Sequence, residues 1–269
     1  MYKARRKMLL IILILGVFSF SPLLSYEADV EKKTEKQEKV MQIIKAGDEL
    51  YSKRENLQNV MKAIDKYKEA LEIDGKCYEA VWRISRAYYY YGWRLDEDDD
   101  EGKKEMFGRG IHWGKIAVKY GGDRPDGHFW LGVNYGCWGE ANGVFKSISM
   151  VDDVEEEMHE TIKIDPSYEG GGPYRLLGRM EYRLPGLLGG DNDDSIKYLR
   201  KAIELGPNNT QNYLFLAETL MEEDEYVEAK RLLEKVISMK PDPRWINEAK
   251  EDRAIAKELL IEVKEELED

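Results

Sequence analysis

The residues that could do chemistry are scattered along this chain rather than grouped. His112, His128 and His159 include no pair at the helical spacing that would place two metal ligands on one face. The acidic run at residues 96–101 alternates like a calcium-binding loop, but its glycine comes one position late and Phe107 stands where the final glutamate belongs. We therefore expect no metal site and no cofactor.

No nucleophile can be matched to a general base and a group that orients it. The chain has no Gly-x-Ser-x-Gly segment and no phosphate-binding glycine loop. Ser147 and Ser149 lie in a glycine-bearing segment that offers them no partner. We therefore expect no catalytic residues and a protein that is not an enzyme.

The N-terminus predicts export. Four basic residues precede an apolar run over residues 8–20, and small residues follow it, as in a secretory signal. The run is short for a membrane span, which needs about 20 apolar residues, so cleavage of residues 1–25 is favoured over their retention as an anchor. Residues 26–39 form a charged linker or the polar start of a helix. The expected location is periplasmic, with or without membrane anchoring.

The charge of the chain excludes nucleic acid as a partner. The formal net charge is −12, and residues 1–25 carry four positive charges and no negative one, so the remaining chain has −16. Nucleic-acid phosphates require a basic face, which a strongly acidic chain does not provide.

A helical hairpin is predicted over residues 170–207. Its first helix opens after a triple glycine with Pro173 near its start, and it ends at the Leu-Pro-Gly of residues 184–186. Asp193, Asp194 and Ser195 are candidate caps for the second helix, which ends at Gly206-Pro207.

The second helix of this hairpin repeats in the sequence. Five second helices carry three landmark residues at spacings of four and three, followed five residues later by glycine or proline. The landmark sets are Ala63, Tyr67 and Ala70; Gly110, Gly114 and Ala117; Val154, Met158 and Thr161; Ser195, Leu199 and Ala202; and Ala229, Leu233 and Val236.

This register resembles the tetratricopeptide repeat (TPR), in which small residues let paired helices approach closely. The resemblance implies an all-α solenoid of five degenerate helical-hairpin repeats over residues 40–241. Extra loop residues are expected at 94–104 and 140–149. Residues 242–269 form a long charged helix that covers the open end, as terminal repeats require.

In the TPR family, first-helix residues at fixed offsets line the concave face. Carried over to this chain, the offsets place arginines among aromatic residues in repeats two to four, at Trp82, Arg86, Tyr89, Phe129, Arg175, Arg179, Tyr182 and Arg183. Arginine suits carboxylate recognition and stacking on aromatic rings, so this set predicts a site for a ligand with an apolar body and a carboxylate. The alternative is structural: the arginines pair with neighbouring acidic residues and the aromatic residues pack between repeats.

The same register separates the two cysteines. Cys77 precedes its helix, whereas Cys137 lies about thirteen residues along the neighbouring one, so the two are roughly 20 Å apart. A disulfide requires Cα atoms within about 7 Å. We therefore expect two free thiols.

The fourth repeat carries a more specific resemblance. Residues 171–179 (GGPYRLLGR), 184–186 (LPG) and 189–191 (GGD) resemble the T-component family of tripartite ATP-independent periplasmic (TRAP) transporters. That resemblance implies a periplasmic TPR-like protein with a central pore or pocket, a solute-binding protein as partner and an organic-acid or hydrophobic ligand. Homotrimers are known within that family. The chain lacks the lipid-attachment cysteine that would tether it to a membrane in the family's manner.

Two functions are therefore considered. The first is a ligand-binding or adaptor protein of TRAP solute transport, which the arginine–aromatic face favours. The second is a general TPR scaffold for protein–protein interaction in envelope assembly, which would bind a partner peptide in its groove.

Overall fold

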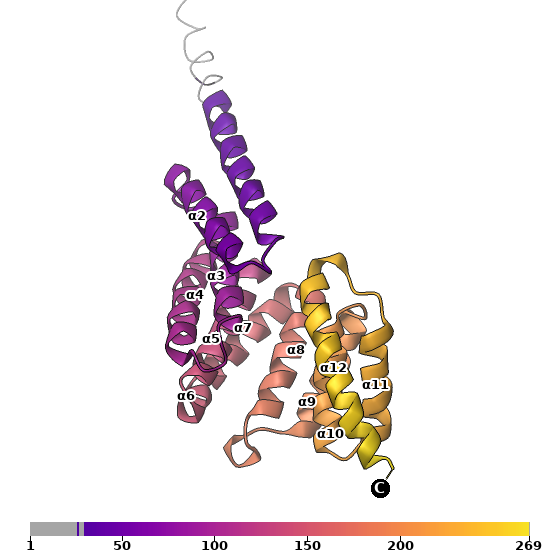
Figure 1. Ribbon diagram of the computed structural model, residues 1–269. Helices are drawn as coiled ribbons and strands as arrows, with labels where there is room; N and C mark the ends of the chain where they lie inside the picture. Colours follow the sequence, from indigo (N-terminus) through magenta and orange to yellow (C-terminus); the bar gives the residue numbers. More distant parts are fainter. Residues whose placement is uncertain (1–25, 27–29, 269) are drawn as a thin grey trace, which may run out of the picture.

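The computed structural model describes residue 26 and residues 30–268. These residues form helices, turns and loops without any β-strand, which confirms the predicted all-α class (Figure 1). The predicted signal segment, residues 1–25, lies outside the described residues. None of the helices in the described part of the chain combines the length and apolarity that a membrane span needs.

The described helices form five antiparallel hairpins and a final helix, as predicted. The first pairs residues 30–51 with α2 (Leu57–Ile73), and the second pairs α3 (Tyr78–Trp93) with α4 (Asp100–Tyr120). The third pairs α5 (Pro125–Ala141) with α7 (Val151–Ile164), and the fourth pairs α8 (Tyr168–Arg183) with α9 (Asn192–Leu205). The fifth pairs α10 (Thr210–Glu222) with α11 (Tyr226–Ser238), and α12 (Ile246–Glu266) follows.

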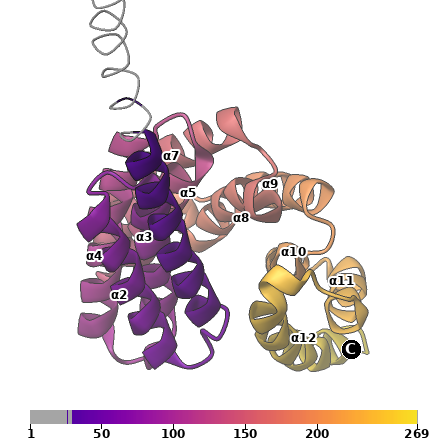
Figure 2. The same ribbon diagram turned by 90° about the horizontal axis from the view of Figure 1, so that it is seen from above.

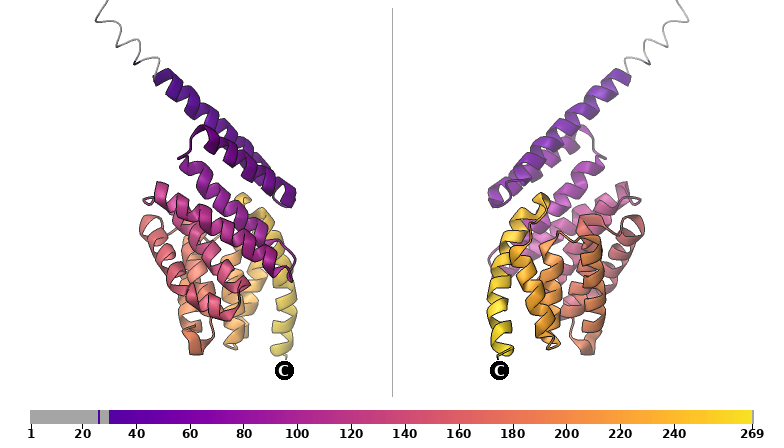
Figure 3. Two further views of the ribbon diagram at one scale, coloured as in Figure 1. Left: turned by 90° about the vertical axis from the view of Figure 1, so that its left-hand side faces the viewer. Right: turned by 90° about the vertical axis from the view of Figure 1, so that its right-hand side faces the viewer.

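The array curves along its length. In Figure 2, α8 and α9 lie between the N-terminal hairpins on one side and α10–α12 on the other. The first helix, residues 30–51, projects beyond the remaining hairpins at its N-terminal end (Figure 3). Residues 30–39 are its exposed polar turns.

The landmark residues of the second helices form the contact between paired helices. All fifteen landmark residues are buried, which confirms the register that was read from the sequence. Small residues of the first helices face the middle landmark: a Cβ atom added to Gly47, Gly132 or Gly178 would lie 2.4–2.7 Å from Tyr67, Met158 or Leu199. The close approach of the paired helices therefore depends on residues without bulk at these positions.

The start of α8 is irregular, as its glycines predict. Glu169, Gly170 and Gly171 have φ angles of 48°, 63° and 76°, so the regular helix begins at Gly172, just before Pro173. The buried Asn212 amide holds this segment, because its Nδ2 lies 2.9–3.0 Å from the carbonyl oxygens of Gly170, Ala202 and Gly206. A single side chain of α10 thus joins the beginning of α8 to the end of α9.

Three local predictions need correction. The cap of α9 is Asp191, which accepts a hydrogen bond from the backbone N–H of Asp194, so the predicted caps lie within the first turn of the helix. The segment 140–149 is not all loop, since it contains the short helix α6 (Val144–Ser149). The second half of the insertion at 94–104 is helical, because α4 begins at Asp100 after Asp99, which caps the helix by accepting from Gly102.

The two cysteines are free thiols, as predicted. Cys77 is buried in the first hydrophobic core, and Cys137 is partly buried on α5. Burial raises the pKa of both thiols, so neither favours the reactive thiolate.

Replacing Gly171 by alanine should strongly destabilise the fold. Its φ of 76° disfavours a side chain, and a Cβ atom there would lie 2.6 Å from the carbonyl oxygen of Ala202. We expect a loss of roughly 2–4 kcal/mol in the free energy of unfolding, measured by urea denaturation. Gly186→Ala is the matched control, because a Cβ atom there meets nothing within 4 Å. Equal stability of the two variants would contradict this account of the α8 start.

Candidate functional site

The structure distributes the predicted site residues over three first helices. They are Trp82, Arg86 and Tyr89 on α3; Phe129 on α5; and Arg175, Arg179, Tyr182 and Arg183 on α8. Two kinds of environment result: the α3 residues join a larger group of arginines and aromatic rings, whereas those of α5 and α8 engage mainly in packing and internal pairing.

Arginines and aromatic rings alternate where the first hairpin meets α3. We call this group the arginine–aromatic stack, and its members are Arg83, Trp82, Arg86, Tyr51, Arg54, Tyr90 and Arg94. Arg86 lies between two rings, with its guanidinium carbon 4.0 Å from the centre of Tyr51 and 4.9 Å from that of Trp82. Arg54 lies between Tyr51 and Tyr90, at 5.2 and 5.3 Å. Such cation–π contacts orient the planar guanidinium groups.

Three of the four arginines in the stack have close carboxylate partners. Arg83 donates to Asp48 at 3.0 Å and to Glu79 at 2.5 Å. Arg54 pairs with Glu248 at 2.8 Å, and Arg94 pairs with Glu251 at 2.5 Å. The last two partners come from α12, so the C-terminal helix supplies anions to arginines near the N-terminal end of the array.

Arg86 is the arginine of the stack without a complete partner. Its Nη2 is 3.7 Å from Asp48, which already accepts from Arg83 and from the Tyr67 hydroxyl. The Nε of Arg86 is buried and has no hydrogen-bond partner among the described residues. Burial alone would lower the pKa of Arg86, but the neighbouring Tyr51, Tyr67 and acidic groups raise it, so the side chain stays charged. A buried cation with an unused donor is a specific place for an added carboxylate.

The other α3 site residue lies beside the stack. Tyr89 packs against Trp130 of α5, with ring centres 5.6 Å apart, and burial raises its pKa well above the usual value. The indole Nε1 of Trp130 is buried and unpartnered. This aromatic pair therefore packs α3 against α5 beside the stack.

On α8, two of the predicted arginines are satisfied within the protein. Arg175 donates to the side-chain oxygen of Asn212 at 2.9 Å, and Arg179 pairs with Glu218 at 2.5 Å. Burial lowers the pKa of both groups. Arg179 also lies over the rings of Tyr182 and Phe215, at 5.1 and 4.3 Å. This arrangement corresponds to the structural alternative that the sequence left open.

The last two predicted residues differ in exposure. Arg183 is exposed at the end of α8. Phe129 is 3% exposed and packs edge-on against Trp130 and Tyr168. Neither residue contacts the arginine–aromatic stack through an aromatic or ionic pair within the described residues.

The sequence interpretation missed Tyr51, Arg54, Glu248 and Glu251. The inner-face offsets were applied from the second repeat onward, so the first helix received no such positions. A signal was present: Tyr51 follows the small Gly47 by four residues, the same offset that places Tyr89 after Ser85. The glutamates of α12 carried no comparable signal, because the repeat register ends before them.

A polar junction joins the first hairpin and the C-terminal end of α3 to α12. Arg54 reaches both carboxylate oxygens of Glu248 and also donates to the carbonyl oxygen of Arg244 at 3.0 Å. Lys250 pairs with Glu55 at 2.5 Å. Together with the Arg94–Glu251 pair, these contacts form what we call the junction. It connects residues separated by more than 150 positions in the chain.

The start of α12 is also tied to the fourth hairpin. Trp245 donates from its indole to Glu169 at 2.9 Å, and its ring lies against Gly170, where an added Cβ atom would come within 2.6 Å of it. The left-handed segment at the start of α8 therefore has a packing role besides its backbone geometry, because it leaves room for Trp245.

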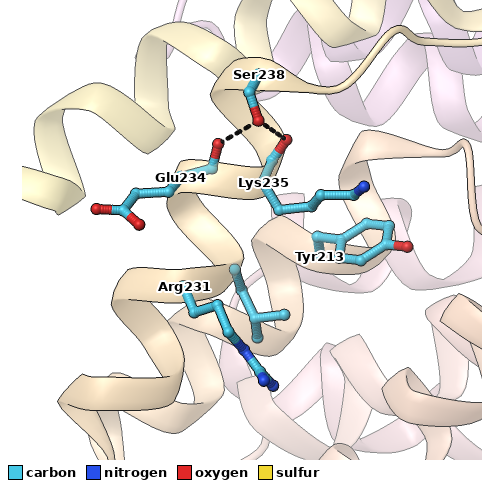
Figure 4. A pocket seen from close by; sticks show the side chains of 6 residues that line it. Tyr213, Arg231, Glu234, Lys235 and Ser238 are labelled. Atoms are coloured by element: carbon cyan, nitrogen blue, oxygen red, sulfur yellow. Dashed lines mark hydrogen bonds between the residues drawn. The ribbon is translucent and has the colours of Figure 1, made fainter.

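Two surface pockets lie away from the stack. The first, of about 370 Å³, is formed by α10 and α11 and includes Tyr213, Arg231 and Lys235 (Figure 4). The second, of about 460 Å³, lies between the first helix and the turn before α3, with Lys33 and Cys77 in its wall. Neither contains a predicted site residue. Within the described range, no group of histidine, cysteine, aspartate or glutamate side chains is arranged to hold a metal ion.

Comparison with known proteins supports the fold. A family model described as regulator of microtubule dynamics protein 1-3 matches residues 43–187, and a TPR model matches residues 187–247. No individually curated protein matches the chain.

Two solved TPR-like structures resemble the array. TTC0263, a thermophilic TPR protein of Thermus thermophilus, has 17% identity and a TM-score of 0.60, over 81% of this chain and 98% of its own. PilF of Pseudomonas aeruginosa has 16% identity and a TM-score of 0.53, over 84% of this chain and 91% of its own. These likenesses agree with the predicted α-solenoid.

The buried carboxyl group of Asp252 should make the free energy of unfolding depend on pH. Asp252 is 4% exposed on α12, where it accepts from the Thr210 hydroxyl, and burial raises its pKa to about 7. Because the folded pKa lies above the unfolded value of about 3.9, the folded state binds more protons between these values, and stability falls as the pH rises from about 4 to 7.

Asp252→Asn should remove this dependence. We expect the wild type to gain roughly 1–3 kcal/mol relative to the variant between pH 7.5 and pH 5, measured by urea denaturation at each pH. Parallel pH profiles for the two proteins would contradict the assignment to Asp252.

Proposed function

The chain belongs to the regulator of microtubule dynamics protein 1-3 family, and we propose that it is a non-enzymatic scaffold that binds another protein. The family description names an effect on microtubule dynamics, which is an effect on a protein assembly. TPR-like arrays present a continuous surface built from successive first helices, which suits an extended or helical segment of a partner.

The observation that carries the proposal is the incomplete environment of Arg86. Every other arginine of the stack has a close carboxylate, whereas Arg86 has only a contact of 3.7 Å to Asp48. Its Nε, like that of Arg94, is buried without a hydrogen-bond partner among the described residues. Tyr51 and Trp82 fix the plane of its guanidinium. A carboxylate of a partner would complete this environment, and we therefore propose that the partner contributes an acidic segment.

The finer assignment from sequence concerns TRAP transport. A small organic acid would offer Arg86 the same carboxylate chemistry, and a solute-binding protein would be the corresponding protein partner. The resemblance of residues 171–191 to T-components is the basis for this prediction. The family model that matches residues 43–187 is a different family and gives this prediction no support. Native mass spectrometry of the purified protein would report a retained acid and a trimer in one measurement.

Export is part of the TRAP alternative. Basic residues followed by the apolar run at residues 8–20 support it, and the periplasm is the compartment that a T-component role would require. N-terminal sequencing of the mature protein would distinguish a cleaved signal from a retained anchor.

Arg86→Gln should weaken binding of acidic segments. Selection from a random displayed-peptide library with the wild-type protein should enrich peptides that contain aspartate or glutamate. Those peptides should bind the variant about tenfold more weakly in fluorescence anisotropy, because the charge-assisted pair is lost. Arg231→Gln is the control, since the Arg231 side chain is 76% exposed and lies outside the arginine–aromatic stack.

Two results would count against the proposed function. One is the absence of acidic enrichment with the wild-type protein. The other is equal affinity of the enriched peptides for the wild type and Arg86→Gln while Arg231→Gln is also unchanged.

A further inference from the structure

The junction between the first hairpin and α12 uses the same chemistry that we propose for the partner. Glu248 and Glu251 of α12 are the carboxylates that pair with Arg54 and Arg94. They are three residues apart on one helix and therefore share a face. The protein thus already holds two carboxylates on one face of a helix against two arginines of the stack.

The junction is polar and lies outside the hydrophobic cores. The core of the first two hairpins extends from Val40 to Tyr90, and the core that includes Ala256 and Val263 of α12 belongs to the last hairpins. The two cores share no residue among those described. Separation at the junction would therefore expose charged groups but leave both cores packed.

The ion pairs of the junction are also reached by solvent to different extents. The side chains of Arg54 and Glu248 are 10% and 24% exposed, those of Arg94 and Glu251 are 23% and 45%, and both partners of the Lys250–Glu55 pair are 59% exposed. The Arg94–Glu251 and Lys250–Glu55 pairs are partly exposed and contribute little net stability each. The Arg54–Glu248 pair is largely buried, so Arg54 can release Glu248 only where a partner supplies another carboxylate in exchange.

The position of the junction next to Arg86 links it to the proposed binding site. Tyr51 lies between Arg54 and Arg86, in contact with both guanidinium groups. If the α12 carboxylates leave, Arg54 and Arg94 lose their close carboxylates and join Arg86 as a strip of incompletely paired arginines on aromatic rings. Glu169 and Asp48 remain as the acidic groups that face Arg86.

We infer that the junction is a displaceable latch: an acidic helical segment of a partner competes with Glu248 and Glu251 for Arg54 and Arg94, and its binding opens the array. This inference rests on the proposed function, because it states which groups of the partner bind, namely carboxylates on a helix, and which internal carboxylates they replace. The α12 sequence supplies the template, with Trp245, Glu248 and Glu251 at successive intervals of three residues.

The test uses a peptide that copies the latch itself. The probe is a fluorescein-labelled peptide with the sequence of residues 243–256 (PRWINEAKEDRAIA), titrated into the full chain and followed by fluorescence anisotropy. The double variant Glu248→Gln/Glu251→Gln should bind it about tenfold more tightly than the wild type, because the internal competitor has lost both charges. Adding Arg54→Gln to the double variant should remove this gain.

A matched variant controls for net charge. Glu262→Gln/Glu265→Gln removes two carboxylates with the same spacing from the exposed end of the same helix, and it should bind the probe like the wild type. If the double junction variant fails to fold by circular dichroism, the single Glu251→Gln substitution serves instead, since that side chain is 45% exposed.

The outcomes separate the latch from the proposed function. Equal affinity of the wild type and the junction variant for the probe, or a gain that persists with Arg54→Gln, would overturn the latch. A gain that depends on Arg54, together with library peptides that ignore Arg86, would support the latch and overturn the proposed site at Arg86.

Discussion

The close approach of paired helices is the constraint on which the rest of this structure depends. Each second helix presents its buried landmarks to a first helix whose facing residue has little or no side chain, as Gly47, Gly132 and Gly178 show. A larger side chain at these places would push the helices apart and change the curvature of the array. The direction in which first helices display their remaining residues, including the arginine–aromatic stack, follows from this packing.

The curvature of the array brings α12 close to the first hairpin, and ion pairs between arginines and carboxylates form the contact between them. The chain carries 53 acidic and 41 basic residues, yet arginines concentrate where α12 approaches the first hairpin. Near them lie Glu248, Glu251 and Asp252, three carboxylates within five positions of one helix. The raised pKa of Asp252, at about 7, reduces the repulsion among them, because this buried group can stay protonated beside its charged neighbours.

The sequence was informative wherever a local rule controlled the structure. The landmark spacing predicted the five hairpins, and Pro173 with the preceding glycines predicted where α8 begins. Asp191 was missed as a cap because several acidic residues follow it directly, and spacing alone does not choose among them. The α6 helix was missed because a six-residue helix within an insertion leaves no periodic pattern.

The junction could not be predicted in the same way, because it depends on the sum of small rotations over all the repeats. Each hairpin contacts mainly its neighbours, so an error in one rotation is multiplied by the distance to α12 and shifts that helix relative to Arg54. Arg54 itself lies in a turn, where the repeat register assigns no direction to a side chain. The same property explains why the junction can respond to a partner: a contact that depends on many small rotations is weakened by a small change in any of them, while each hairpin keeps its own core.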